Sequence, residues 1–66
     1  MATSREINYK SRHIKITAAK SGATYVGTFE IMADPVVTGR GADAQTEAAA
    51  LDNAESAAKE RVDLMH

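Results

Sequence analysis

The sequence predicts an α+β domain in which a three-stranded antiparallel sheet is followed by one long C-terminal helix packed on one face, a β-β-β-α plan. Apolar and polar residues alternate through much of residues 7–38, which is the period of a half-buried strand. From residue 43 onwards the apolar residues recur at spacings of three and four, the period of a helix. A chain of 66 residues makes one domain, and we expect residues 1–6 to be a flexible N-terminus and residues 7–66 to fold.

The first clear strand is predicted in residues 12–19. Ile14, Ile16 and Ala18 lie on one side of it, and polar residues lie on the other. Residues 7–10 also alternate, and they either add to this strand or form a separate edge. The strand is therefore expected to bury one face and expose the other.

A hairpin is predicted between this strand and a second one in residues 24–32, which is rich in β-branched and aromatic residues. Gly22 suits the turn because it can adopt a positive φ. The register that matches side chains best pairs Ala18 with Tyr25, Ile16 with Gly27, Ile14 with Phe29, Thr17 with Val26, Lys15 with Thr28 and His13 with Glu30. Gly27 leaves room for Ile16 or for a helix to approach.

Pro35 marks a turn before a short third strand in residues 36–38, and glycines at 39 and 41 end that strand. Asp43 is the predicted N-cap of a helix that runs to about Asp63. The apolar stripe of this helix is expected at Ala44, Ala48, Leu51, Ala54 or Glu55, Ala58, Val62 and Met65. Glu55 and Lys59 are spaced to form an i, i+4 ion pair.

The charges are unevenly distributed along the chain, although the net charge is only −1. Residues 1–20 hold five Lys or Arg against one Glu, whereas residues 21–66 hold three against eight Asp or Glu. A basic strand facing one way and an acidic helix facing another would make the molecule dipolar.

The composition narrows the class of protein. There is no cysteine, which excludes disulfides and thiolate metal sites and suits a reducing cytosol. No apolar run reaches the length of a membrane span, so we expect a cytoplasmic protein without membrane association. Much of the apolar content is alanine, which leaves a thin core and favours a homodimer.

No residue pattern predicts catalysis, a cofactor site or a metal site. His13 is expected on the exposed strand face near Glu30, and nothing around it suggests a nucleophile. The segment Gly39-Arg40-Gly41 lacks the third glycine of a dinucleotide fingerprint and the lysine of a phosphate-binding loop. We therefore expect a non-catalytic protein with no cofactor.

One helix can cover only one face of the sheet, and the uncovered face is the predicted binding surface. Its candidate residues are Arg12, His13, Lys15, Thr17, Thr28 and Glu30. A protein partner is the favoured occupant. The alternative is nucleic acid, since basic and threonine side chains suit phosphates and base edges, but the chain has few cations and the face has no stacking aromatic.

Three families show a similar pattern. The segment Ile7-Asn8-Tyr9-Lys10 with Ile14, and the ending Val62-Asp63-Leu64-Met65-His66, resemble short bacterial proteins of the same β-β-β-α plan. The hairpin from Ile14 to Ile31, the strand Val36-Val37-Thr38-Gly39 and the helix segment from Thr46 to Ala54 resemble HicB-like small bacterial domains. This resemblance implies an antitoxin-type fold without the DNA-binding extension, and a role in protein binding without catalysis. Gly39-Arg40-Gly41 and Ala48 to Ala58 are similar to the end of double-stranded-RNA-binding domains, although Asp43 to Glu47 stands where that family has lysines. The sheet-plus-helix plan also resembles the DNA-binding arms of integrases.

Overall fold

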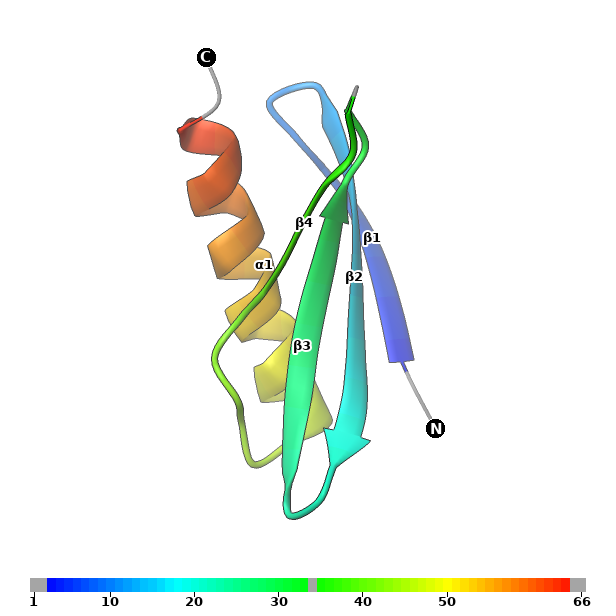
Figure 1. Ribbon diagram of the computed structural model, residues 1–66, viewed down its shortest axis with the longest axis vertical. Coiled ribbons are helices and arrows are strands. Elements are labelled where there is room, and N and C mark those ends of the chain that lie inside the picture. The colour runs from blue at the N-terminus through cyan, green and yellow to red at the C-terminus, as the bar shows by residue number, and fades with distance from the viewer. Residues whose placement is uncertain (1–2, 34, 65–66) are drawn as a thin grey trace.

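The computed structural model describes residues 3–33 and 35–64. It confirms the α+β class, with an antiparallel sheet and one C-terminal helix, but the sheet has four strands and not three (Figure 1). The elements are β1 (Thr3–Tyr9), β2 (Arg12–Ser21), β3 (Thr24–Ile31), β4 (Val37–Arg40) and α1 (Glu47–Asp63). The strands lie in the order β1-β2-β3-β4, so each strand pairs with its neighbour in sequence.

The additional strand is β1, which includes residues 3–6 of the segment predicted to be flexible. It pairs with β2 along its whole length, from Thr3 opposite Ala18 to Tyr9 opposite Arg12. The turn between them consists of Lys10 and Ser11, with φ of 50° and 67°. Positive φ at both central residues is the geometry of a type I′ hairpin turn, which usually takes Asn and Gly. This turn was not predicted, because neither lysine nor serine is typical of a type I′ turn.

The hairpin of β2 and β3 forms with a register two residues away from the prediction. Ile14 pairs with Ile31, Ile16 with Phe29 and Ala18 with Gly27. The difference arises at the turn, where Ser21 pairs with Thr24 and only Gly22 and Ala23 remain as the loop. Gly22 has a φ of 63°, as predicted. Because side chains alternate with a period of two, a shift of two residues leaves every side chain on its predicted face.

Strand β4 begins one residue later and ends two residues later than predicted, so Gly39 and Arg40 belong to it. A Cβ atom on Gly39 would lie 2.5 Å from Cζ of Phe29, its partner on β3. Glycine thus leaves room for the Phe29 ring, which extends over the strand and would have to shift if residue 39 had a side chain. The backbone N–H of Gly41 donates to the carbonyl of Gly27 at 2.9 Å and continues the ladder past β4.

Helix α1 begins later than predicted. Thr46 and not Asp43 is the N-cap, and its Oγ1 accepts a hydrogen bond from the N–H of Ala49 at 3.1 Å. Asp43 instead forms an ion pair with Arg40 at 3.2 Å. The later start makes Ala50 the first buried residue of the stripe, while Ala48 is exposed. From Leu51 through Ala54, Ala58 and Val62 the predicted stripe is buried, and Met65 lies outside the described residues.

The core lies between α1 and one face of the sheet. Its largest fully buried side chains are Ile14, Ile16 and Ile31, and Phe29 is 7% exposed. Alanines at 50, 54 and 58 allow the helix to approach closely. At Gly27 an added Cβ would lie 2.3 Å from the carbonyl oxygen of Ala50. The small side chains of both elements therefore determine how closely the two layers pack.

Candidate binding surface on the open sheet face

The helix covers one face of the sheet, and the other face carries no second layer in the described part of the chain (Figure 1). We call this second face the open face. The alternation of side chains and the strand registers assign to it Ser4, Glu6, Asn8, His13, Lys15, Thr17, Ala19, Thr24, Val26, Thr28, Glu30, Thr38 and Arg40. Most of these residues are exposed, in agreement with the predicted period.

Two cross-strand rows run through the middle of the open face. In the first, Glu6, Lys15 and Glu30 stand side by side on β1, β2 and β3. In the second, Thr17 and Thr28 are direct neighbours. Directly opposed side chains lie about 5 Å apart at Cβ, within reach of one another. The single cation of the first row thus stands between two carboxylates, which balances the charge of the face locally.

A shallow depression of about 440 Å³ lies over β2, β3 and β4 on this face. Its polar lining consists of Lys15, Thr17, Thr28, Glu30, Thr38 and Arg40. The structure therefore brings together four of the six predicted surface residues. Arg40 was missed because the third strand was predicted to end at residue 38, and Thr38 was inside that strand but was not assigned to a face. Continued alternation through Arg40 was the signal that could have identified them.

Two of the predicted surface residues, Arg12 and His13, do not line the depression. Arg12 is in register with Tyr9, so its side chain belongs to the face that carries the helix. His13 is on the open face, but its Nε2 lies 2.8 Å from Oε1 of Glu6, and its Nδ1 lies 3.3 Å from Oδ1 of Asn8. The predicted contact of His13 with Glu30 is wrong, because the observed register places Glu30 opposite Lys15.

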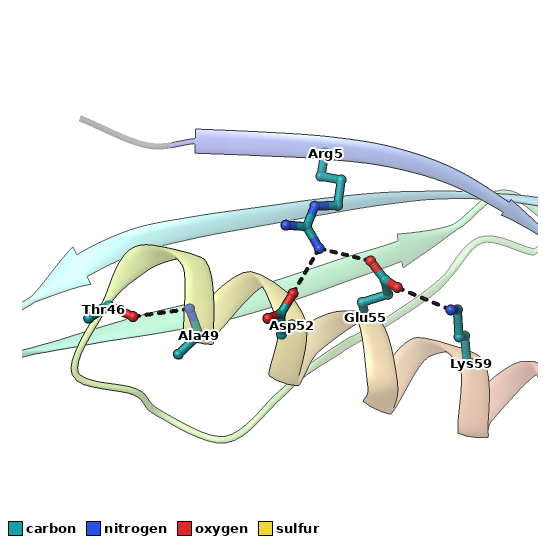
Figure 2. Close-up of polar contacts among 6 residues, drawn as sticks. All are labelled: Arg5, Thr46, Ala49, Asp52, Glu55 and Lys59. Atoms are coloured by element: carbon teal, nitrogen blue, oxygen red, sulfur yellow. Dashed lines mark hydrogen bonds and ion pairs between the residues drawn. The ribbon is translucent and has the colours of Figure 1, made fainter.

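Arg5 joins the basic and the acidic parts of the chain, so the prediction that these parts face in different directions is wrong for this residue. Its Nη1 contacts Oδ1 of Asp52 at 3.1 Å and Oε1 of Glu55 at 2.9 Å, so β1 is held to α1 (Figure 2). The hydrogen bond to Asp52, and to a smaller extent the one to Glu55, raises the pKa of Arg5. Part of the basic segment is thus neutralised within the molecule.

Glu55 completes this network. Its Oε2 accepts from Nζ of Lys59 at 3.1 Å, which confirms the predicted i, i+4 pair (Figure 2). Hydrogen bonds from Lys59 and then from Arg5 lower the pKa of Glu55. Only 24% of the Glu55 side chain is exposed, so this carboxylate is the most sheltered member of the network.

A second set of polar contacts closes the end of the same layer. Nζ of Lys10 forms an ion pair with Asp63, which raises the pKa of Lys10, and the hydroxyl of Tyr9 donates to Asp63 at 3.1 Å. The ammonium groups of Lys10 and Lys59 lie 5.5 Å and 5.6 Å from the centre of the Tyr9 ring. These contacts tie the first hairpin to the end of α1 and pair a further cation, at the surface, with a carboxylate of the same chain.

Neither a metal centre nor a membrane span emerges from the described residues. Within residues 3–33 and 35–64 there is no group of three or more His, Asp or Glu side chains that could hold a metal ion. No helix in these ranges combines the length and apolar character needed to cross a bilayer. Comparisons with protein-family models, curated proteins and solved structures found no match to the chain.

Proposed function

We propose that this chain is a non-catalytic protein-binding module that acts through the open face. The observation that carries the proposal is a four-stranded sheet covered on one side only, with a depression over β2, β3 and β4 on the uncovered side that is lined by both polar and apolar groups. A sheet holds its backbone rigidly, and its exposed side chains here are of several chemical kinds. Such a surface suits the docking of another protein. The composition, free of cysteine, suits the reducing cytosol as the place of action.

The charges on the open face favour a protein over a nucleic acid. Affinity for nucleic acid depends on cations that neutralise phosphates. Here Lys15 stands between Glu6 and Glu30, and Arg40 is paired with Asp43. Carboxylates beside each of these cations would repel a phosphate backbone. A protein surface with charges of both signs can match them.

The shape of the site favours binding over catalysis. Enzyme sites are concave and hold reacting groups around a substrate from which water is excluded. The depression on the open face is shallow and is formed by neighbouring side chains of a sheet. The resemblance of the sequence to HicB-like domains implies the same kind of role.

The proposal can be tested with two matched arginine substitutions. Thr28→Arg places a large side chain in the depression, whereas Ser56→Arg places the same side chain on the exposed side of α1. Partners are captured by a photo-crosslinking residue at position 17, identified by mass spectrometry and measured again as purified proteins. Loss of binding with Thr28→Arg and with Lys15→Ala, but not with Ser56→Arg, is the expected result.

Unchanged partner binding in Thr28→Arg and Lys15→Ala would refute the open face as the site. A titration with a short DNA or RNA duplex, followed by amide shifts at low and moderate salt, tests the rival class. Shifts at Lys15, Thr17 and Thr28 that fade as salt rises would favour nucleic acid, because counterion release makes such binding strongly dependent on salt.

A further inference from the structure

The free edge of β4 has backbone groups directed away from the sheet. The N–H of Gly41 bonds to the carbonyl of Gly27, so the alternate residues of β4, Gly39 and Val37, also point their backbone groups toward β3. The N–H and C=O groups of Thr38 and Arg40 must then point outward. Such an edge can accept one more antiparallel strand.

A groove of about 350 Å³ lies beside this edge, between β4 and the C-terminal half of α1. It is lined by Phe29, Gly39, Arg40, Ala57, Glu60, Arg61 and Leu64. The side chain of Leu64 is 73% exposed and is therefore available for contact. The groove thus combines apolar contacts with one acidic residue, Glu60, and two basic residues, of which Arg40 is already paired with Asp43 and Arg61 is adjacent to Glu60.

The opposite edge of the sheet differs. Along β1 the charged side chain of Arg5 faces the helix layer and is paired with Asp52 and Glu55, and Glu6 projects on the other side. Charged residues of this kind protect an edge strand from pairing. On β4 the helix-side residues, Val37 and Gly39, carry no charge, and the one charged residue of the strand, Arg40, lies on the open face and is paired with Asp43. The β4 edge is therefore the one suited to association.

We propose that the β4 edge and its groove bind a second copy of this chain about a two-fold axis at Gly39. Antiparallel pairing about this axis sets Thr38 opposite Arg40 of the second copy and the reverse, so that the outward-pointing backbone groups exchange hydrogen bonds. The two Gly39 residues face each other at the axis. Because neither has a side chain, the backbones of the two β4 strands can approach each other closely there.

The groove-lining residues of α1 can also contact their counterparts in the second copy about this two-fold axis. Gly39 lines the groove together with Ala57, Glu60 and Arg61 of α1 and with Leu64, the C-cap, and the centre of this set lies between Glu60 and Arg61. A two-fold axis at that centre sets Glu60 opposite Arg61 of the second copy, and Ala57 opposite its Leu64. Acid meets base and a small side chain meets a large one. The groove is thus complementary to itself, which is what an isologous interface requires.

The assembly would be an eight-stranded antiparallel sheet with both helices on one face. The two depressions of the open face would adjoin across the axis, since Thr38 and Arg40 belong to both features. A four-residue strand and one short helical stripe form a small interface. Small interfaces of this kind are weak, so we expect a dissociation constant of about micromolar order.

Sedimentation equilibrium over a wide range of concentrations tests the proposal, with Thr38→Pro as the first variant. Proline at residue 38 removes an N–H that points to the free edge and leaves the bonds between β3 and β4 intact. We expect its dissociation constant to rise at least tenfold. Ser4→Pro, which removes an outward N–H from the β1 edge, is the matched control and should leave the dimer unchanged.

A charge exchange in α1 tests the helix contact separately. Glu60→Arg should weaken the dimer, and the double variant Glu60→Arg with Arg61→Glu should restore it, because the pair is re-formed with opposite sense. An isotope-filtered NOE between the α-protons of Gly39 in the two copies provides the direct contact. A chain that stays monomeric at millimolar concentration, or a dimer indifferent to Thr38→Pro and Glu60→Arg, would overturn the proposal. The open-face variant Thr28→Arg lies outside this edge, so failure here is distinguishable from failure of the proposed function.

Discussion

Replacing Gly27 with alanine tests how the helix and sheet pack. The added methyl group would lie 2.3 Å from the carbonyl oxygen of Ala50 and 2.9 Å from Cβ of Ala54, whereas ordinary contacts begin near 3.4 Å. Helix α1 would have to retreat by roughly 1 Å, and such overpacking costs about 1–3 kcal/mol. Retreat of the helix would also loosen the contacts of the core residues on either side.

The same substitution also brings a gain in stability that offsets part of this cost. Alanine in a strand is favoured over glycine by about 0.5–1 kcal/mol, because glycine loses more backbone entropy on folding. A domain of 66 residues has a total stability of roughly 3–10 kcal/mol. We therefore expect Gly27→Ala to lower the free energy of unfolding by about 1–2 kcal/mol, a large share of the whole.

Urea denaturation followed by far-UV circular dichroism measures this change. The double variant Gly27→Ala with Ala54→Gly should recover little, because the nearest atom is the backbone oxygen of Ala50 and not a side chain. Gly22→Ala is the control: nothing lies within 4 Å of its added methyl, so its loss comes only from the positive φ. A Gly27→Ala protein as stable as the parent would refute the close contact of helix and sheet.

Three further predictions concern local features. Ser11→Gly should raise the free energy of unfolding by about 0.5–1 kcal/mol, since φ of 67° strains serine but not glycine, and a lower urea midpoint would contradict the type I′ turn. Thr46→Ala should lower the same free energy by about 1 kcal/mol through loss of the N-cap, whereas Asp43→Ala should change it little; equal losses would contradict Thr46 as the cap. The pKa of Glu55 is lowered on folding, so its contribution is present above the unfolded pKa of about 4.3 and is lost as pH falls through the folded value. Urea midpoints measured from neutral to acidic pH should therefore decline less steeply for Glu55→Gln than for the parent, and identical slopes would contradict a stabilising role for this carboxylate.

The open face shows what could be predicted from local pattern. Lys15, Thr17, Thr28 and Glu30 were assigned to one surface from their alternation alone, and the structure places them around one depression. The assignment is correct although the predicted hairpin register is wrong, because a shift of two residues moves no side chain from one face of the sheet to the other. The assignment of Arg12 to this surface was wrong, because Arg12 lies two residues before Ile14 and therefore on the helix side of β2, in register with Tyr9.

Features that depend on distant contacts were beyond the local pattern. Residues 3–6 hold no large apolar side chain, and they join β1 because Arg5 and Thr3 reach α1, where Arg5 binds Asp52 and Glu55 and Thr3 donates to Glu47. No rule of strand propensity includes carboxylates that lie about fifty positions away along the chain.

The sequence by itself determined the class of the fold, the two faces of each strand and the helical stripe from Leu51 onwards, because side-chain periodicity is a local property of the backbone. The tertiary structure decided the strand number, the hairpin register and the pairing of the basic strand with the acidic helix. These depend on which surfaces meet, and many registers and pairings satisfy the same local pattern. The close packing of α1 against Gly27 and the position of β4 at the edge of the sheet were also decided by the tertiary structure, since both exist only once the strands have paired and the helix has packed on them.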